Sequence, residues 1–436
     1  MTDRETSELE AEDEAVDEVS DAGDAQPSKH VMTAAEALEK IQRGEVIEGV
    51  RIERLRLRGA FAKPVQFRRV TLAGFSIEGA NFADLVSFEA CTLDRPQISK
   101  KSFFTKDLRF MGSTIIKPQF RNFKVHGTCR LDSVRARGKF LVQNAEIATI
   151  RLWDAVFNGW VEFKQCEFLG SADFRSFHVE EGFILTQCKF RDDLLFRGTV
   201  VQKKWQADRT RFDGLVDLSK AKLHDYVYLE DIEQGEKQRF AFANMVAERI
   251  LIRPDQVEGR LASEISGDYS QAMYEYAFLK RVFEGLHRYD QEDWAFYRFK
   301  VNQRLSRQRS WKRPWSKCSH FGDWLFLDHG CGYGTNPGRA IRAAVVIMFA
   351  FALIYMAGID SFIVDPDNMP FEGPKHTFAN RTMIATLTSV SAFISGFGDM
   401  RLAAKGWMNV PLIIESILGT LLWGLFIVAF SRKVIR

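Results

Sequence analysis

The chain has 436 residues, enough for two or three domains, and 60 Lys or Arg against 57 Asp or Glu give a net charge of +3. The mean hydropathy of −0.18 is that of a mostly soluble chain, but it averages over strongly segregated segments. The sequence contains no Ser-His-Asp set, paired carboxylates or nucleotide-binding fingerprint in a suitable context, which argues against an enzyme. Its six cysteines include no CxxC pair and no companion His at metal-ligand spacing, so we expect free thiols, no metal site and no cofactor.

The first segment of the chain is acidic. Residues 1–26 carry eleven Asp or Glu and a single basic residue, Arg4, with no aromatic side chain. Such a composition buries too little apolar surface to offset the entropy of ordering, so we predict a disordered tail over residues 1–30. It also lacks the basic start and apolar core of a secretory signal, which indicates that the part following it stays in the cytoplasm. We expect a short helical cap at residues 31–49.

A repeat explains why the chain is rich in phenylalanine, since 20 of its 37 phenylalanines lie between residues 50 and 231. Between residues 157 and 229 large apolar residues recur at alternating steps of six and five, which makes a period of 11 and a double period of 22. KQCEF at 164–168 thus returns as TQCKF at 186–190. Steps of five and six residues rotate the apolar side chain off any single face of a helix, and they do not match the two-residue alternation of a strand. Short straight segments joined by corners fit these steps. The sequence therefore predicts a β-solenoid with coils about 4.8 Å apart, in which each side points one large and one small side chain inward. The large positions are Phe157, Phe163, Phe168, Phe174, Val179, Leu185, Phe190, Phe196, Val201, Ala207, Phe212, Leu218, Leu223 and Leu229, and the small ones are Ala155, Cys166, Ala172, Cys188, Thr210 and Ala221.

The same pattern continues less regularly upstream. It includes GANFADLVSFEACTL at 79–93 and then Ile98, Phe103, Phe120, Val125 and Leu131. Residues 50–231 resemble the pentapeptide-repeat family in its Phe-rich form, and the resemblance implies a right-handed β-solenoid. Cys166 and Cys188 lie one coil apart, and we interpret them as stacked core residues rather than as a disulfide or a metal pair. Some members of that family resemble duplex DNA in shape and charge, but positive and negative side chains are mixed on the outward positions here, which disfavours that role. We expect no nucleic-acid partner.

Helical spacing replaces the repeat after Leu229, and residues 232–318 form a predicted helical connector. Its first helix begins near Asp268 and its second near Asp290, with apolar residues at three- and four-residue steps at Met273, Tyr276, Leu279, Phe283, Leu286, Trp294, Tyr297 and Val301. We expect this aromatic stripe to pack on the last coil or on a neighbouring subunit. RLSRQRSWKRPWSK at 304–317 has six basic residues and two Trp, which could suit nucleic acid but better fits a collar for anionic membrane lipid. GCGYGTNP at 330–337 is interpreted as a glycine-rich turn in a juxtamembrane segment, 319–342.

Two apolar stretches near the C-terminal end are long enough to cross about 30 Å of hydrocarbon. Residues 343–359 contain no charge, and residues 410–430 contain one, Glu415. Basic residues flank the outer ends of both, so we predict that both termini and the solenoid are cytoplasmic, at a bacterial inner or plasma membrane. Between them, NRTMIATLTSVSAF at 380–393 is too short to span and too apolar for an exposed loop, which indicates a helix that dips into the membrane. ISGFGDM follows as an extended return.

This order of elements, over about residues 341–436, resembles the two-helix pore module of the potassium channel family. The resemblance implies a homotetramer with a two-helix pore domain at 343–436 and a pore loop at 380–400. It also implies a selectivity filter formed by Ile394, Ser395, Gly396, Phe397, Gly398 and Asp399. Glycine tolerates the left-handed backbone that a ring of inward-facing carbonyls requires, and Asp399 would add negative charge at the outer mouth.

Five further residues have expected roles in such a module. Thr388, Ser389 and Glu415 are expected to support the filter, with Glu415 facing protein rather than lipid, because a carboxylate in lipid is costly. Gly419 and Gly424 stand where the inner helix of the family bends to gate, and a role as helix-packing glycines is an equal alternative.

Ile394 departs from the family pattern. The family has Thr there, whose side-chain oxygen serves the innermost ion site, and isoleucine has no such oxygen. The expected function is a tetrameric cation channel, with potassium as the expected ion and its selectivity over sodium left open. Its cytoplasmic solenoid would sense or tether an unidentified protein or ligand. The alternative is a membrane-anchored interaction scaffold whose degenerate pore loop does not conduct.

Overall fold

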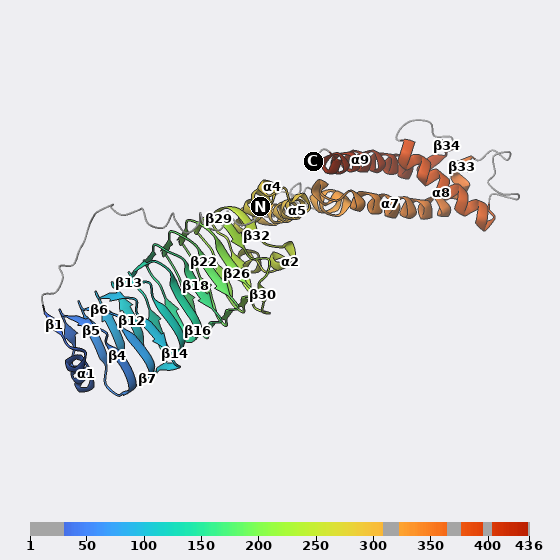
Figure 1. Ribbon diagram of the computed structural model, residues 1–436. Helices are drawn as coiled ribbons and strands as arrows, with labels where there is room; N and C mark the ends of the chain where they lie inside the picture. Colours follow the sequence, from blue (N-terminus) through green and yellow to red (C-terminus); the bar gives the residue numbers. More distant parts are fainter. Residues whose placement is uncertain (1–29, 308–321, 364–375, 396–402, 435–436) are drawn as a thin grey trace, which may run out of the picture.

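A computed structural model of the chain describes residues 30–307, 322–363, 376–395 and 403–434. An elongated β-solenoid is followed by helices that cover its last coil, and further helices project from that cover (Figure 1). In the described parts of the chain two helical stretches, Pro337–Ala357 and Gly406–Val434, are long and apolar enough to cross a membrane. The acidic tail expected at 1–30 lies outside the described residues, except for His30.

The solenoid has about ten coils, and its strands pair in parallel with those of the neighbouring coils. In its regular part Val161 lies opposite Phe183, and Phe183 lies opposite Trp205, so one coil takes 22 residues, as the double period predicts. The strand pairings define four columns, one for each side of a coil, and the longer strands turn corners and belong to more than one column.

The first column contains β1 (Val31–Met32), β3 (Arg51–Glu53), β6 (Thr71–Ala73), β9 (Thr92–Asp94), β13 (Thr114–Ile116), β15 (Arg135–Arg137), β17 (Val156–Phe157), β21 (His178–Val179), β25 (Val200–Val201), β29 (Lys222–Tyr228) and β32 (Val246–Leu251). The second contains β4 (Arg56–Phe61), β7 (Ser76–Phe82), β10 (Gln97–Ser99), β14 (Gln119–Arg130), β16 (Phe140–Arg151), β18 (Val161–Lys164), β22 (Phe183–Thr186) and β26 (Trp205–Asp208). The third adds β11 (Ser102–Phe104), β19 (Glu167–Phe168), β23 (Lys189–Phe190), β27 (Arg211–Phe212) and β30 (Glu233–Gln234). The fourth adds β2 (Ile47–Glu48), β5 (Val65–Arg68), β8 (Val86–Glu89), β12 (Leu108–Met111), β20 (Ala172–Asp173), β24 (Leu194–Leu195), β28 (Leu215–Asp217) and β31 (Arg239–Ala241).

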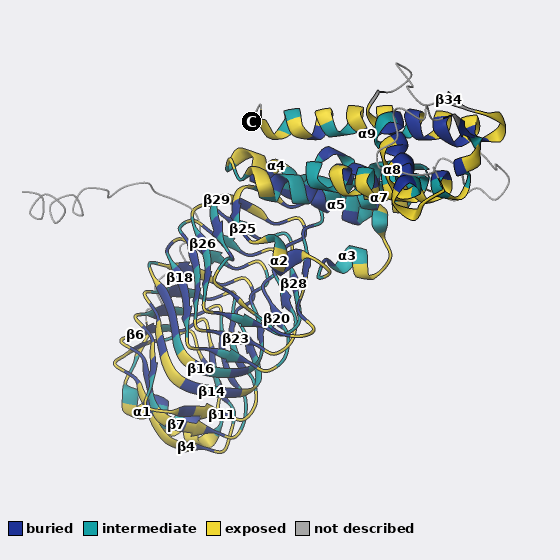
Figure 2. Ribbon diagram, turned by 90° about the vertical axis from the view of Figure 1, so that its right-hand side faces the viewer, coloured by how far each residue is buried: buried dark blue, intermediate teal, exposed yellow. Residues whose placement is uncertain are grey.

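The core of the solenoid consists of stacked side chains, and the residues that contribute them are coloured dark blue as buried along the ribbon in Figure 2. All the large and small positions predicted between 155 and 229 are at most 1% exposed. The rings of Phe168 and Phe190 stack with their centroids 4.6 Å apart, and those of Phe190 and Phe212 are 5.2 Å apart, close to the spacing between strands. Cys166 and Cys188 are free, buried thiols, as predicted.

The predicted register is wrong at one upstream position. Phe103 is 38% exposed, whereas its neighbour Phe104 is 1% exposed and continues the stack from Phe82 at 5.0 Å. The corner before β11 contains two consecutive left-handed residues, Lys100 and Lys101, and therefore takes one residue more than a five-residue step allows. Because successive side chains of a strand alternate, this extra residue turns Phe103 outward.

The strands also continue past residue 231, where the repeat was expected to end. β29 pairs with β32, and Phe240, Ile250 and Ile252 are fully buried. Lys222 lies opposite Val246, so this coil takes 24 residues instead of 22. The pattern is lost after Leu229 because the next position in register, Gln234 opposite Phe212, is polar, and because two additional residues lie between Gln234 and Arg239.

Helices cover both ends of the solenoid. At the first coil α1 (Ala34–Arg43) buries Ala37 and Ile41, and Thr33 and Glu36 form a capping box at its start. At the last coil the cover consists of α2 (Pro254–Val257), α3 (Ala262–Ile265), α4 (Tyr269–Gly285) and α5 (Tyr289–Ser306). The two longer helices begin where the sequence predicted.

The remaining elements lead into and form the apolar helices. They are the π-helix η1 (Asp323–Gly330), the 3-10 turn η2 (Gly332–Gly334), α7 (Pro337–Ala357), η3 (Ile359–Ser361), β33 (Phe362–Ile363), α8 (Phe378–Ser395), β34 (Ala403–Ala404), η5 (Gly406–Met408) and α9 (Asn409–Val434). β33 and β34 pair in antiparallel fashion. As predicted, GCGYGTNP contains a turn: Gly332, Tyr333 and Gly334 have φ of 57°, 54° and 79°.

A pair of adjacent substitutions tests the corrected register. Phe104→Ala removes a buried ring and is expected to destabilise the solenoid by about 3–5 kcal/mol, whereas Phe103→Ala at an exposed position is expected to change stability by less than about 1 kcal/mol. The measurement is the midpoint of urea unfolding followed by the β-sheet circular dichroism signal. Equal shifts for the two variants, or a larger shift for Phe103→Ala, would contradict the assignment.

Candidate functional site

The helix α8 lies against both span-length helices, at the end of α7 and α9 that is remote from the solenoid (Figure 1). It corresponds to the helix predicted at 380–393, extended by two residues at each end. The Arg381 guanidinium donates from Nε to the carbonyl oxygen of Met356 at 2.6 Å, which fastens the start of α8 to the end of α7. Three helices therefore form one small bundle.

A buried carboxylate joins these three helices. Glu415 of α9 is fully buried and faces protein, as predicted. One carboxylate oxygen accepts a hydrogen bond from the Tyr355 hydroxyl of α7 at 2.6 Å, and the other contacts the Ser389 hydroxyl of α8. The Ser389 oxygen also lies 2.8 Å from the carbonyl oxygen of Met348, so its single hydrogen is donated to one of these two acceptors at a time.

The other predicted support and hinge residues have different surroundings. Thr388 is 3% exposed, but its hydroxyl donates to the Ile384 carbonyl of its own helix and does not take part in the Glu415 cluster. A Cβ at Gly419 would lie 2.3 Å from the carbonyl oxygen of Phe393, so this glycine lets α8 and α9 approach closely. A Cβ at Gly424 would meet no atom of the described residues within 4 Å. Packing between α8 and α9 therefore explains Gly419, whereas no contact among the described residues of one chain requires a glycine at position 424.

Only the beginning of the predicted filter is described. Ile394 and Ser395 belong to the last turn of α8, so they are helical rather than extended, and the Ile394 side chain is 61% exposed. Gly396, Phe397, Gly398 and Asp399 lie outside the described residues. Ile394 and Ser395 are compatible with a helix, because each costs less in a helix interior than glycine or proline does.

The other end of the bundle is joined to α5 by ion pairs. The Asp328 carboxylate of η1 accepts hydrogen bonds from Tyr297 and Arg304 of α5, both at 2.7 Å, and lies 3.6 Å from Arg339 at the start of α7. The Arg339 guanidinium also lies over the Tyr297 ring, 4.6 Å from its centroid. Asp328 is only 6% exposed, so this buried charge is compensated by two cations.

The last turn of α9 contacts the first half of α5. Arg432 lies 3.1 Å from Asp293 and 3.6 Å from the buried Glu292, and its guanidinium covers the Phe296 ring at 4.3 Å. Lys280 of α4 lies 3.3 Å from the same Glu292. The helix α5 therefore contacts the ends of both span-length helices that face the solenoid.

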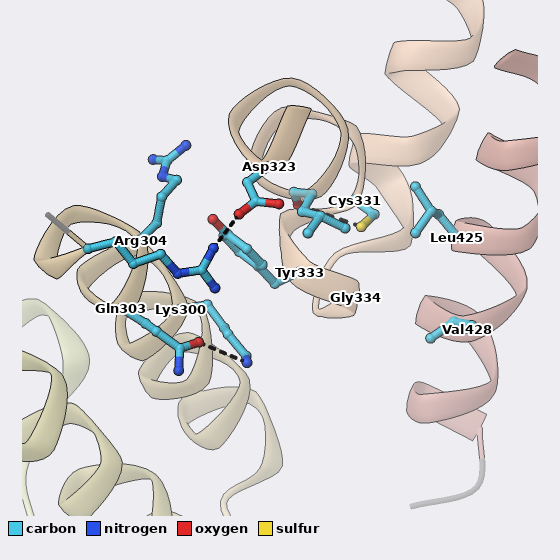
Figure 3. Close-up of a pocket in the computed structure, with 11 residues that line it drawn as sticks. Lys300, Gln303, Arg304, Asp323, Cys331, Tyr333, Gly334, Leu425 and Val428 are labelled. Atoms are coloured by element: carbon cyan, nitrogen blue, oxygen red, sulfur yellow. Dashed lines mark hydrogen bonds and ion pairs between the residues drawn. The ribbon is translucent and has the colours of Figure 1, made fainter. Parts of the chain in front are cut away.

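A pocket of about 330 Å³ separates the second half of α5 from α9. Figure 3 shows Lys300, Gln303 and Arg304 on one side, Leu425 and Val428 on the other, and Tyr333 between them. Tyr333 is held in the left-handed conformation between two glycines, and its hydroxyl has no hydrogen-bond partner among the described residues. Of the basic collar predicted at 304–317, Arg304 and Arg307 are described, and both form ion pairs with η1, to Asp328 and Asp323 respectively.

Comparisons of the chain with protein-family models, with curated proteins and with solved structures found no match. The arguments about function therefore depend on the residues of this chain and on their geometry.

Sequence reasoning missed several partners in these clusters. Tyr355 is the clearest, because it lies 60 residues before Glu415 and forms the buried hydrogen bond that orients it. A tyrosine within an apolar stretch was a usable signal, since a buried hydroxyl requires a partner. Asp328 and Arg432 were equally visible as charges at the borders of apolar stretches.

Removal of the buried carboxylate should loosen the three-helix bundle. Glu415→Ala leaves the Tyr355 and Ser389 hydroxyls without their shared acceptor, and is expected to destabilise the bundle by about 1–3 kcal/mol. Ile414→Ala is the matched control, because its side chain is 46% exposed on the outer face of the same helix. The measurement is the temperature at which the detergent-solubilised chain loses its monodisperse elution. The interpretation fails if both variants lose it at the same temperature.

Proposed function

We propose that the chain forms a tetrameric cation channel that conducts potassium, with a pentapeptide-repeat solenoid of right-handed coil in the cytoplasm. The observation that supports this most strongly is the position of α8. It is held between two span-length helices by the buried Glu415, and its last residue, Ser395, directly precedes Gly-Phe-Gly-Asp. A short helix followed by this sequence is what a pore helix and an ion filter require.

The composition of the bundle surface agrees with assembly inside a membrane. Large apolar side chains point away from the bundle on both long helices, among them Val346 at 66%, Phe349 at 67% and Ile427 at 58% exposed. In water such a surface would be unfavourable, whereas lipid or neighbouring copies can cover it. Because one chain supplies one segment of a ring of carbonyls, the proposal requires four copies around a common axis.

The connector gives the solenoid a route to the proposed pore. α4 packs on the last coil and α5 packs on α4, while Asp328 and Arg432 link α5 to the solenoid-facing ends of α7 and α9. A protein or ligand bound by the solenoid would therefore act through α5 on both helices. Under this proposal the solenoid senses or tethers its partner, and α5 is the positioning element between them.

Conduction is the first test of the proposal. The purified chain, reconstituted into potassium-loaded vesicles, is expected to give cation flux well above that of the Gly396→Asp variant, because a side chain and a charge at this glycine would disrupt a filter. The mass of the complex in mild detergent is measured in parallel, and four copies are expected. A folded monomer or dimer with no flux would contradict the channel and favour the membrane-anchored scaffold with a closed loop.

Ion choice is a separate prediction. An isoleucine at 394 cannot offer a side-chain oxygen to an ion, so the wild-type chain is expected to discriminate weakly between potassium and sodium. Ile394→Thr is expected to raise the potassium-to-sodium permeability ratio by roughly tenfold, which corresponds to about 1.4 kcal/mol. Reversal potentials under mixed-ion conditions provide the measurement, and Ile394→Val, which adds no oxygen, is the control. A rise in the valine variant equal to that in the threonine variant would show that the oxygen is not the cause.

A further inference from the structure

One corner of the solenoid carries cations that form no ion pair with the described residues. Lys117, Arg135 and Arg137 are exposed there, and none of them has a carboxylate within 4.0 Å among the described residues. Elsewhere on the coils exposed cations commonly pair across coils, as Arg58 does with Glu78 and Lys203 does with Glu181. We call the three unpaired residues the basic corner.

The backbone of this corner brings the three side chains together. Arg135 and Arg137 lie in β15, one coil beyond β13, whose Ile116 is the register partner of Arg137. Lys117 follows Ile116 in a left-handed conformation, and its backbone N–H donates to the carbonyl oxygen of Arg137. A Cβ at Gly138 would lie 2.9 Å from Cγ of Lys117, so the absence of a side chain at Gly138 leaves room for the Lys117 stem.

Few carboxylates of the described chain compensate this charge. Arg95 and Lys139 flank the basic corner, which brings the group to five cations. Two carboxylates accompany them: Asp94 lies 3.5 Å from Arg95, and Glu162 lies 2.7 Å from Lys139. Five cations against two carboxylates leave a net charge of +3 on a small exposed area, which is suited to an acidic partner.

The acidic N-terminal segment is joined to the same face of the solenoid. Val31 opens the first strand column, and the register runs from β1 through β3, β6, β9 and β13 to β15. Five steps of about 4.8 Å place Arg135 about 24 Å from the point where residues 1–29 join the described chain. Twenty-nine residues can span up to about 95 Å, so the eleven carboxylates of residues 1–26 are within reach.

We propose that residues 1–26 dock on the basic corner of the same chain, and that this acidic segment is a built-in occupant of the solenoid surface. The attraction is electrostatic, and the tether keeps the segment at an effective concentration in the millimolar range. An acidic segment of a partner protein would have to displace it. The proposal does not depend on conduction, so a failure of the channel proposal would leave it unaffected.

The test follows cleavage of the tail in the intact chain. A Glu-specific protease releases fragments of residues 1–26, and mass spectrometry gives their rate of release relative to a free synthetic peptide of residues 1–29 in the same buffer. In 50 mM salt the tail of the intact chain is expected to be cleaved roughly tenfold more slowly than the peptide, and in 500 mM salt the two rates should converge because salt screens the contacts.

Two charge reversals locate the docking site. Arg135→Glu combined with Arg137→Glu is expected to abolish the protection in 50 mM salt. Lys222→Glu is the matched control: it lies exposed in the same strand column, four steps or about 19 Å beyond Arg135, farther than one screening length at this salt concentration. The tail of the Lys222→Glu variant should remain protected from the protease in 50 mM salt.

Three results would overturn the proposal. The first is a wild-type tail that is cleaved as fast as the free peptide in 50 mM salt. The second is loss of protection in Lys222→Glu equal to that in the double variant. The third is tight binding of a short DNA duplex at the basic corner while the tail is cleaved freely, which would assign the surface to nucleic acid instead.

Discussion

The exposed end of the last coil is the constraint on which the rest of the structure depends. Each coil satisfies its backbone hydrogen bonds with the coil before and the coil after it, so the last coil would present an unpaired edge. α4 covers this edge, and the Glu275 carboxylate accepts a hydrogen bond from the backbone N–H of Phe242 at 3.3 Å. Burial raises the pKa of Glu275, and the Ser263 hydroxyl compensates part of that desolvation. The helix α4 therefore covers the last coil through polar as well as apolar contacts.

The same cover positions the apolar helices. α5 is fixed to it through Glu264, which accepts two hydrogen bonds from Arg298 at 2.8 and 2.9 Å and one from the Tyr276 hydroxyl. The opposite side of α5 contacts Asp328 and Arg432. The position of the three-helix bundle thus follows from how the solenoid ends, and among the described residues the contacts between the two parts run through α5, a helix of 18 residues.

Local rules made most of the solenoid predictable. A coil of 22 residues repeats its inward positions, so the burial of Phe157 through Leu229 could be derived from spacing alone. The failures occurred where a corner or a coil changes length. One extra residue at Lys100–Lys101 reverses which side chains face inward, and two extra residues between Gln234 and Arg239 lengthen the coil that follows Leu229. Hydrophobic spacing reports the period but does not report where a corner absorbs an extra residue. The helices α4 and α5 were predictable because their apolar steps and the cap at Asp268 are local signals.

The side-chain clusters at the apolar helices were less predictable, for a physical reason. Glu415 could be identified as buried because lipid is unfavourable for a carboxylate, but its partners come from two other helices, and one of them, Tyr355, is 60 residues away. The choice of partner depends on how α7, α8 and α9 pack, which no local pattern encodes.

The two ends of the three-helix bundle are held by contacts of different kinds, which differ in how much movement they tolerate. At the end remote from the solenoid, Glu415 is fully enclosed and Gly419 brings α8 within contact of α9, so relative movement there would leave hydroxyls unpaired and open a packing gap. At the solenoid end the links are charged side chains on flexible stems, with Arg432 and Arg339 each stacked on an aromatic ring of α5. Such contacts tolerate small displacements, because a guanidinium can follow a carboxylate while its stem adjusts. Gly424, where an added Cβ would meet no described residue within 4 Å, lies on α9 between the rigid end and the adjustable one. In the proposed channel a shift of α5 would therefore bend α9 near Gly424 before it disturbed α8, and the segment that precedes Gly396 would remain in place.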